Sequence, residues 1–379
     1  MTHLAIPSRR PWWAPARAAL GPFLAVRLGV ALLAFAGAWT VRGTVVDSGA
    51  SYLAQWDRWD VGLYVRLAQF GYDGDPSMPP DPGLPSFFPG YPLLLRAVHL
   101  LVPSWILAGL LISLVAGAVT ALALVRLAVV EGHSLEVGRR AVLYLFCAPY
   151  AVFLVAGYTE AVFLALALPA WVAAKQQRWV WAGLLAGAAS SVRITGVFLG
   201  VALVVHYALA VGRPRREAVA LLAPFVVVAG YFTYLHSRTG DWLAWTHAQE
   251  AGFGRRFALP WDAFRTTLDS GLNAGAGPEY RFSFFAEIGF VLLGIALVLA
   301  LLRLRRWAEA VYVGLSVGAL ASSTFFFSVS RASLLWWPLF LLLAVAAARR
   351  PWVHTAYLAV ALPLLAATTL AFTAGRWVG

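Results

Sequence analysis

Apolar runs recur along the chain from about residue 18 to residue 373, and they constrain the fold more than any other feature. Many runs are about 17–25 residues long, the length that an α-helix needs to cross a bilayer. Only 12% of the residues are charged and 61% are hydrophobic, whereas soluble domains carry roughly 25% charged residues. Because lipid cannot hydrogen-bond the backbone of an open sheet, the sequence predicts an all-α polytopic membrane protein.

We expect one membrane domain, residues 18–379, with about eleven spanning helices after a polar and basic cytoplasmic tail at 1–17. Two long loops, at 42–103 and 236–282, interrupt the series of spans. The first apolar run is too long for a signal peptide and lacks a suitably placed cleavage site, so we expect it to be retained. The expected spans cover 18–41, 104–130, 139–157, 159–174, 179–192, 194–212, 217–235, 283–302, 307–326, 332–348 and 352–373.

Basic residues gather in the short connections between apolar runs, and most acidic residues lie in the long loops or at the span ends that face them. Because cytoplasmic connections are enriched in Lys and Arg, this pattern places the N-terminus in the cytoplasm and both long loops outside. The net charge of +12 therefore indicates topology control and contact with anionic lipids rather than nucleic-acid binding. The preference for arginine over lysine and the abundance of alanine are typical of a bacterial protein, so we expect a multi-pass protein of the bacterial plasma membrane.

The first long loop opens with two carboxylates between tryptophans, in a motif that reads QWDRWDVGLY at 55–64. On a helix, the spacing of three would put Asp57 and Asp60 on one face. We expect a short interfacial helix between Trp59 and Phe70, because that stretch contains no proline and only one glycine. Asp60, partly desolvated by the neighbouring rings, suits a general base. The same residues also fit an aromatic belt with solvated acids, or a carboxylate that simply pairs with an arginine.

Four further charged residues are expected near the same outer face. Glu160 begins a span, where it either complements the helix dipole or faces the same cavity as Asp60. Arg193 and Arg331 lie at outer ends of spans, and Arg255 lies in the second loop. Arginine binds phosphate in bidentate fashion, but isolated arginines at an interface also serve as plain anchors. The second loop is correspondingly either a lid over a substrate or a structured aromatic loop.

Several classes of site have no signature in this sequence. The single cysteine, Cys147, excludes an internal disulfide and a cysteine-built metal site. The histidines lack metal-ligand spacing, and there is no Walker loop, dinucleotide fingerprint or G-x-S-x-G elbow. We therefore expect no metal and no cofactor. Because nucleotide sugars and ATP are not supplied outside the cytoplasm, a synthetic reaction there requires an activated donor that has already crossed the membrane.

Taken in order, the motifs resemble those of the PIG-V-type mannosyltransferases, in the bacterial branch of the GT-C glycosyltransferase superfamily. The resemblance covers nearly the whole chain and departs from the family at Thr159, where serine is usual, and at Ala332, where tyrosine is usual. The motifs are Arg58–Tyr64, Gly71–Asp73, Phe87–Leu93, Tyr158–Phe163, Arg193–Gly196, Gly240–Trp242 with the loop as far as Arg255, and Ser330–Arg331.

This resemblance implies a GT-C-type fold and an inverting transfer of mannose from polyprenyl-phosphate mannose, in a donor class whose enzymes mostly work without metal. The acceptor would be a hydroxyl of a lipid-linked or cell-envelope glycan. Asp60 takes the place of the family's catalytic carboxylate, with Asp57 as its neighbour. The expected substrate-binding residues are Glu160, Arg193, Arg255, Arg331, Tyr64 and Trp59.

Two other functions remain open from the residues alone. A lipid or polyol transporter or flippase would carry ionisable residues near mid-span, and Arg27 is the main residue of that kind. Another outer-face glycan ligase or polymerase would share the same charge placement. The transferred sugar is also open, because related GT-C enzymes use arabinose, glucose or galactose carriers.

Overall fold

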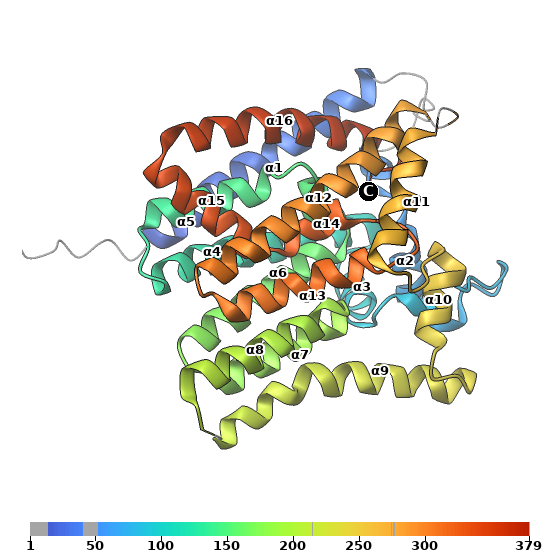
Figure 1. The fold of residues 1–379 in the computed structure, drawn as a ribbon. Helices are drawn as coiled ribbons and strands as arrows, with labels where there is room; N and C mark the ends of the chain where they lie inside the picture. The colour runs from blue at the N-terminus through green and yellow to red at the C-terminus, as the bar shows by residue number, and fades with distance from the viewer. Residues whose placement is uncertain (1–13, 41–51, 214, 274, 276, 379) are drawn as a thin grey trace, which may run out of the picture.

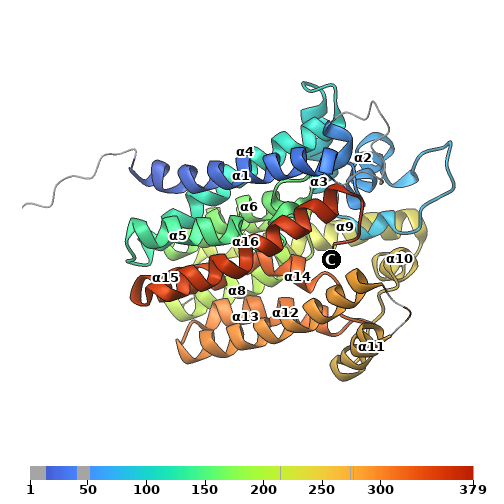
Figure 2. The same ribbon diagram turned by 90° about the horizontal axis from the view of Figure 1, so that it is seen from above.

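The protein is a bundle of α-helices that run side by side along a common axis (Figures 1 and 2). The computed structural model describes residues 14–40, 52–213, 215–273, 275 and 277–378, so most of the expected tail at 1–17 lies outside the described residues. Within these ranges no β-strand occurs, and one isolated antiparallel bridge pairs Phe257 with Ser323. The predicted all-α class is therefore confirmed.

Each expected span coincides with a helix of the bundle. Among the described residues, five helices are long and apolar enough to cross a membrane, as expected of a polytopic membrane protein. The other bundle helices are shorter, so the number of about eleven crossings stays a prediction. The bundle helices are α1 (Ala14–Thr40), α4 (Trp105–Val130), α5 (Leu135–Phe146), α6 (Thr159–Lys175), α7 (Trp179–Val192), α8 (Thr195–Val211), α9 (Ala223–Thr239), α12 (Pro278–Arg303), α13 (Trp307–Ala321), α15 (Trp337–Arg349) and α16 (Pro351–Thr373).

Two expected spans are interrupted in the structure. Helix α5 ends at Phe146, shortly before Pro149, and a buried 3₁₀ turn, Ala151–Leu154, follows it. The span expected at 332–348 is preceded by the short helix α14 (Val329–Ala332), and the chain bends by 71° before α15. Pro338 lies in the first turn of α15, where a proline ring fits because the backbone amide there has no partner within the helix, and Trp336 before the helix has a non-helical ψ of 64°.

The remaining helices gather at one end of the bundle, on the right in Figures 1 and 2. They are α2 (Asp60–Phe70), α3 (Gly90–His99), α10 (Ala244–Phe253) and α11 (Pro260–Leu272). All four come from the two long loops, and α2 confirms the helix expected between Trp59 and Phe70.

At the opposite end, ion pairs join helices that are distant in sequence. Lys175 Nζ lies 3.1 Å from Glu309 Oε1 and 3.4 Å from Glu131 Oε1. Arg306 Nη2 lies 2.7 Å from Glu131 Oε1 and 2.8 Å from Glu309 Oε1. Glu131 and Glu309, two of the few acidic residues at this end, are thus neutralised by Lys175 and Arg306.

Arg27, the charge expected inside the first span, faces protein. Its guanidinium donates to the carbonyl oxygens of Leu154 at 2.8 Å, Leu110 at 3.1 Å and Val155 at 3.3 Å. Ionisable side chains within membrane helices are normally satisfied in this way. Arg27 therefore ties α1 to α4 and to the 3₁₀ turn after α5.

Candidate active site

A cavity of about 650 Å³ is lined by residues of α2 and α10. These helices lie at one end of the bundle (Figure 1). Four charged side chains line it: Asp60, Arg193, Arg255 and Arg331. Aromatic side chains form much of the remaining wall: Trp59, Tyr64, Phe87, Phe88, Phe153, Tyr158, Phe198, Trp245, Phe253, Phe327 and Trp377. The cavity therefore combines a small charged cluster with a largely aromatic wall, as ligand pockets commonly do.

A sharp turn places Asp60 at the cavity. Asp60 is the first residue of α2, and Trp59 before it has φ 54° and ψ −119°. Such a backbone is unusual for a bulky residue, and outliers of this kind concentrate at functional sites. Asp57 precedes the turn, is exposed and is not among the described residues that line the cavity. The expected common helical face for Asp57 and Asp60 is therefore wrong, because the helix begins only at Asp60.

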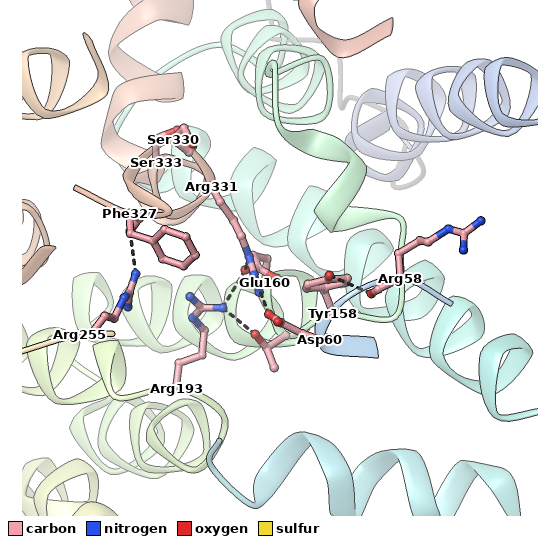
Figure 3. Close-up of polar contacts among 11 residues, drawn as sticks. Arg58, Asp60, Tyr158, Glu160, Arg193, Arg255, Phe327, Ser330, Arg331 and Ser333 are labelled. Carbon is pink, nitrogen blue, oxygen red and sulfur yellow. Dashed lines mark hydrogen bonds and ion pairs between the residues drawn. The ribbon is translucent and has the colours of Figure 1, made fainter. Parts of the chain in front are cut away.

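Arg331 bridges two carboxylates (Figure 3). Its Nη1 lies 2.8 Å from Asp60 Oδ2, and its Nε donates to Glu160 Oε1. Arg193 Nη1 donates to the same oxygen of Glu160 at 2.7 Å and to Thr159 Oγ1 at 2.6 Å. The structure thus brings Asp60, Glu160, Arg193 and Arg331 into one connected cluster, with Glu160 behind the cavity wall.

Burial makes this cluster sensitive to the loss of any member. The side chain of Glu160 is fully buried, and an isolated buried carboxylate costs several kcal/mol. Two guanidinium groups compensate that cost. Arg331 is also held by aromatic rings, since its guanidinium carbon lies 4.8 Å from the centre of Phe153 and 4.5 Å from that of Tyr158. Its orientation toward Asp60 is therefore defined from several sides.

Glu287, on α12, positions the short helix that carries Arg331. One carboxylate oxygen accepts hydrogen bonds from the backbone amides of Val329 at 2.6 Å and Ser330 at 3.3 Å, and the other accepts from Ser330 Oγ at 2.7 Å. Glu287 is one of the acidic residues at span ends that face the long loops, and the sequence analysis assigned it no role. An acidic residue within a largely apolar helix requires a polar partner, and this requirement could have pointed to a structural role for Glu287.

Arg255 enters the cavity from the connection between α10 and α11. Its Nη2 donates to the carbonyl oxygen of Phe327 at 2.7 Å, and its guanidinium lies 4.9 Å from the centre of the Phe327 ring. Its Nε is buried and has no hydrogen-bond partner among the described residues. Burial lowers the pKa of Arg255 to about 10, so the side chain remains charged at neutral pH. Arg255 therefore offers a cation that no described carboxylate neutralises directly.

Trp59 and Tyr64 form part of the aromatic wall. Trp59 is half exposed, whereas Tyr64 is buried and packs edge-on against Phe87, Tyr91 and Tyr158. Burial raises the pKa of Tyr64 above its usual value, so its phenol stays neutral. Both residues therefore line the cavity, and their contact with substrate stays a prediction.

Phe327 and Trp377 belong to the cavity but carry no sequence signal. Their rings stack with centres 5.4 Å apart, and Trp377 also stacks on Tyr280. Trp377 follows the last helix of the bundle, so only the folded chain brings it beside Arg255 and its partner Phe327. No three His, Cys, Asp or Glu side chains within the described ranges lie close enough to hold a metal ion.

A comparison with protein-family models identifies the relatives of this chain. Residues 33–224 match the model described as Mannosyltransferase (PIG-V). The chain belongs to the PIG-V mannosyltransferase family. The match contains Asp60, Glu160 and Arg193, whereas Arg255 and Arg331 lie beyond it and reach the same cavity through the fold. A search of curated proteins found no match. Membership of the PIG-V family confirms the resemblance and assigns the chain a mannosyltransferase activity.

Proposed function

We propose that this PIG-V family member transfers mannose from polyprenyl-phosphate mannose to a hydroxyl of a lipid-linked or cell-envelope glycan, on the extracytoplasmic face of the bacterial plasma membrane. One observation carries the proposal: Asp60 and three arginines line a single cavity. A carboxylate serves as a proton acceptor, and arginines stabilise a leaving phosphate.

Asp60 is the proposed general base. As the acceptor oxygen attacks the anomeric carbon, its proton passes to Asp60 and the bond between that carbon and the phosphate oxygen breaks. This single displacement inverts the anomeric centre. Arg331 contacts Oδ2 of Asp60, and no described residue donates to Oδ1, so Oδ1 is the atom proposed to take the proton. The ion pair with Arg331 then orients the base and is compatible with catalysis.

The three arginines have different roles in this proposal. Arg331 and Arg193 already bind carboxylates, and Arg331 mainly positions Asp60. Arg255 binds only a carbonyl oxygen and a ring face, so it is the first candidate to hold the donor phosphate. Three arginines against Asp60 and Glu160 leave the cluster with one formal positive charge, which complements the single negative charge of a phosphodiester.

The arrangement of the bundle supports an extracytoplasmic site. The cavity lies at the end formed by the two long loops, and the arginine-rich short connections lie at the other end (Figure 2). Basic connections face the cytoplasm in membrane proteins. On that face the reaction requires a lipid-linked donor rather than a nucleotide sugar.

Transfer from radiolabelled polyprenyl-phosphate mannose tests the proposal. Membranes that contain the wild type or folded Asp60→Asn are mixed with a native lipid extract as the acceptor pool. Label should move to a new product with the wild type only. A wild type that is inert toward this donor and active with another polyprenyl-phosphate sugar would change the assigned sugar. Inactivity with every such donor would overturn the proposal.

A further inference from the structure

A second cavity, of about 450 Å³, lies beside the first. It is bounded by α2, α3, α9 and the outer end of α7. The apolar residues that line it include Leu67, Ala68, Pro92, Leu93, Val227 and Gly230. Its volume lies within the range of roughly 300–1,000 Å³ that is typical of ligand sites.

The two cavities are neighbours at two points. Phe88 lines both of them. Ser191 lines the second cavity and Arg193, two residues later, lines the first. A molecule with a charged group at Arg193 and Arg255 could therefore continue past Phe88 into the second cavity.

The second cavity presents hydrocarbon and ring faces. The hydroxyl of Tyr72 donates to the carbonyl oxygen of Phe87 at 2.7 Å, and that of Tyr231 donates to Pro85 at 2.8 Å and Phe87 at 3.0 Å. With both phenols satisfied, these residues offer their rings to a ligand. The ring centres of Phe88 and Tyr231 lie 4.8 Å apart, so the aromatic wall is continuous with the boundary between the cavities.

The outer side of this cavity faces the surroundings of the bundle. Leu93 is 62% exposed and Val226, next to the lining residue Val227, is 65% exposed. A Cβ atom built on Gly230 would meet no other atom within 4 Å. Among the described lining residues Arg96 is the one that carries a charge, and it is exposed in the last turn of α3. A hydrocarbon chain can thus enter from the bilayer and pack against the apolar wall.

We propose that the second cavity binds the isoprene units of the donor that lie next to its phosphate. This inference rests on the proposed function, because it requires a polyprenyl-phosphate donor. The phosphate lies against Arg255 and Arg193, and the chain passes Phe88 to lie between α3 and α9. The acceptor then approaches Asp60 from another side of the first cavity. The second cavity selects donors by their lipid rather than by their sugar.

Gly230→Phe tests the proposal, because Gly230 lines the cavity, a Cβ atom there meets nothing within 4 Å, and the added ring takes up space that the lipid would occupy. Activity is measured with a long-chain donor and with methyl-phosphate mannose, which has the same phosphodiester but no isoprene unit to occupy the cavity. The variant should raise KM for the long-chain donor by at least about tenfold, as expected for the loss of a few buried methylene groups. Its kcat/KM for the short donor should equal that of the wild type.

Gly289→Phe is the matched control. Gly289 lies exposed on α12, away from the described lining residues, and a Cβ atom there would also meet nothing within 4 Å. It should leave both donors unaffected. If Gly230→Phe does not fold, Val227→Trp, on the same helix and in the same cavity, should give the chain-length effect.

Equal kinetics of wild type and a folded cavity-filling variant with both donors would overturn the inference and leave the proposed function intact. A rise in KM for the acceptor instead of the donor would also overturn it, since the cavity would then hold the acceptor lipid. A wild type that uses neither donor would overturn the proposed function and the inference together.

Discussion

Arg331 Nη1 lies 2.8 Å from Asp60 Oδ2, although 271 positions separate the two residues in the chain. The same guanidinium binds Glu160, so α2, α6 and α14 meet at one side chain. Asp60 is therefore oriented before any substrate arrives. Preorganised groups cost no reorganisation at the moment of reaction, which makes such an arrangement effective in catalysis.

Asp60→Asn should lower kcat by about 10²–10⁴-fold, because the side-chain amide of asparagine cannot take up the proton of the attacking hydroxyl group. Asp57→Asn is the matched control: Asp57 is exposed and lies before the turn at Trp59, so its loss should change kcat by less than about threefold. Transfer of labelled mannose in membranes with equal amounts of folded protein measures both. A large loss with Asp57→Asn and a small one with Asp60→Asn would exchange their roles.

Arg331→Met should destabilise the protein by about 3–5 kcal/mol, because it removes a cation between two carboxylates, one of which is fully buried. Glu160→Gln in the same chain should recover part of that loss, since it removes the buried charge that Arg331 compensates. Thermal unfolding in detergent of the wild type, both single variants and the double variant measures how strongly Arg331 and Glu160 depend on each other for stability. Strictly additive shifts in Tm would show that the two side chains do not stabilise each other.

Arg255→Gln should lower kcat/KM for the donor by about 10- to 100-fold, which corresponds to one charged hydrogen bond to phosphate. Arg256→Gln, one residue further, removes the same charge from a side chain that is 67% exposed and 3.5 Å from Glu250, and it should have little effect. Steady-state kinetics at varied donor concentration gives kcat/KM for the two variants and the wild type. Equal losses would point to a general effect of positive charge on this loop.

The charge of Arg255 also predicts a pH effect. Its pKa of about 10 means that the guanidinium loses its proton as the pH rises through that value. KM for the donor should therefore rise on approach to pH 10 in the wild type and stay flat in Arg255→Gln, while the unfolding temperature is followed as a control. Parallel profiles for the two proteins would assign the effect to another group.

Labelling tests the orientation of the bundle. Cys147 is buried, so the wild-type protein should give little background with a membrane-impermeant maleimide. Ser77→Cys, exposed in the first loop, should react in intact cells, whereas Glu217→Cys, between α8 and α9, should react only after permeabilisation. The opposite pattern would place the cavity on the cytoplasmic face.

Much of the fold could be predicted from the sequence, because hydropathy alone determines which segments suit lipid. The helix at Asp60–Phe70 followed from the lack of proline between Trp59 and Phe70. The predicted common helical face of Asp57 and Asp60 was wrong. Sequence periodicity does not reveal that Trp59 adopts a positive φ, which makes the helix begin only at Asp60.

The contacts of the site were less accessible to sequence reasoning. Residue types suggested arginines near Asp60, but the choice of Arg331 as its partner depends on the break between α14 and α15. No local pattern encodes the hydrogen bonds that hold α14 to Glu287. The same is true of the stacking of Phe327 on Trp377, because both contacts join residues that are distant in the sequence.

The positive charge of the cluster affects the end of the catalytic cycle as well as its start. In the proposed reaction the donor is a phosphodiester with one negative charge, and the spent carrier lipid is a monoester with a charge of about −1.5 to −2 at neutral pH. Three arginines against two carboxylates favour the more highly charged species. For the proposed reaction, we therefore expect the spent carrier lipid to compete with the donor for this cluster, so that turnover depends on how quickly the membrane pool of that lipid is recharged.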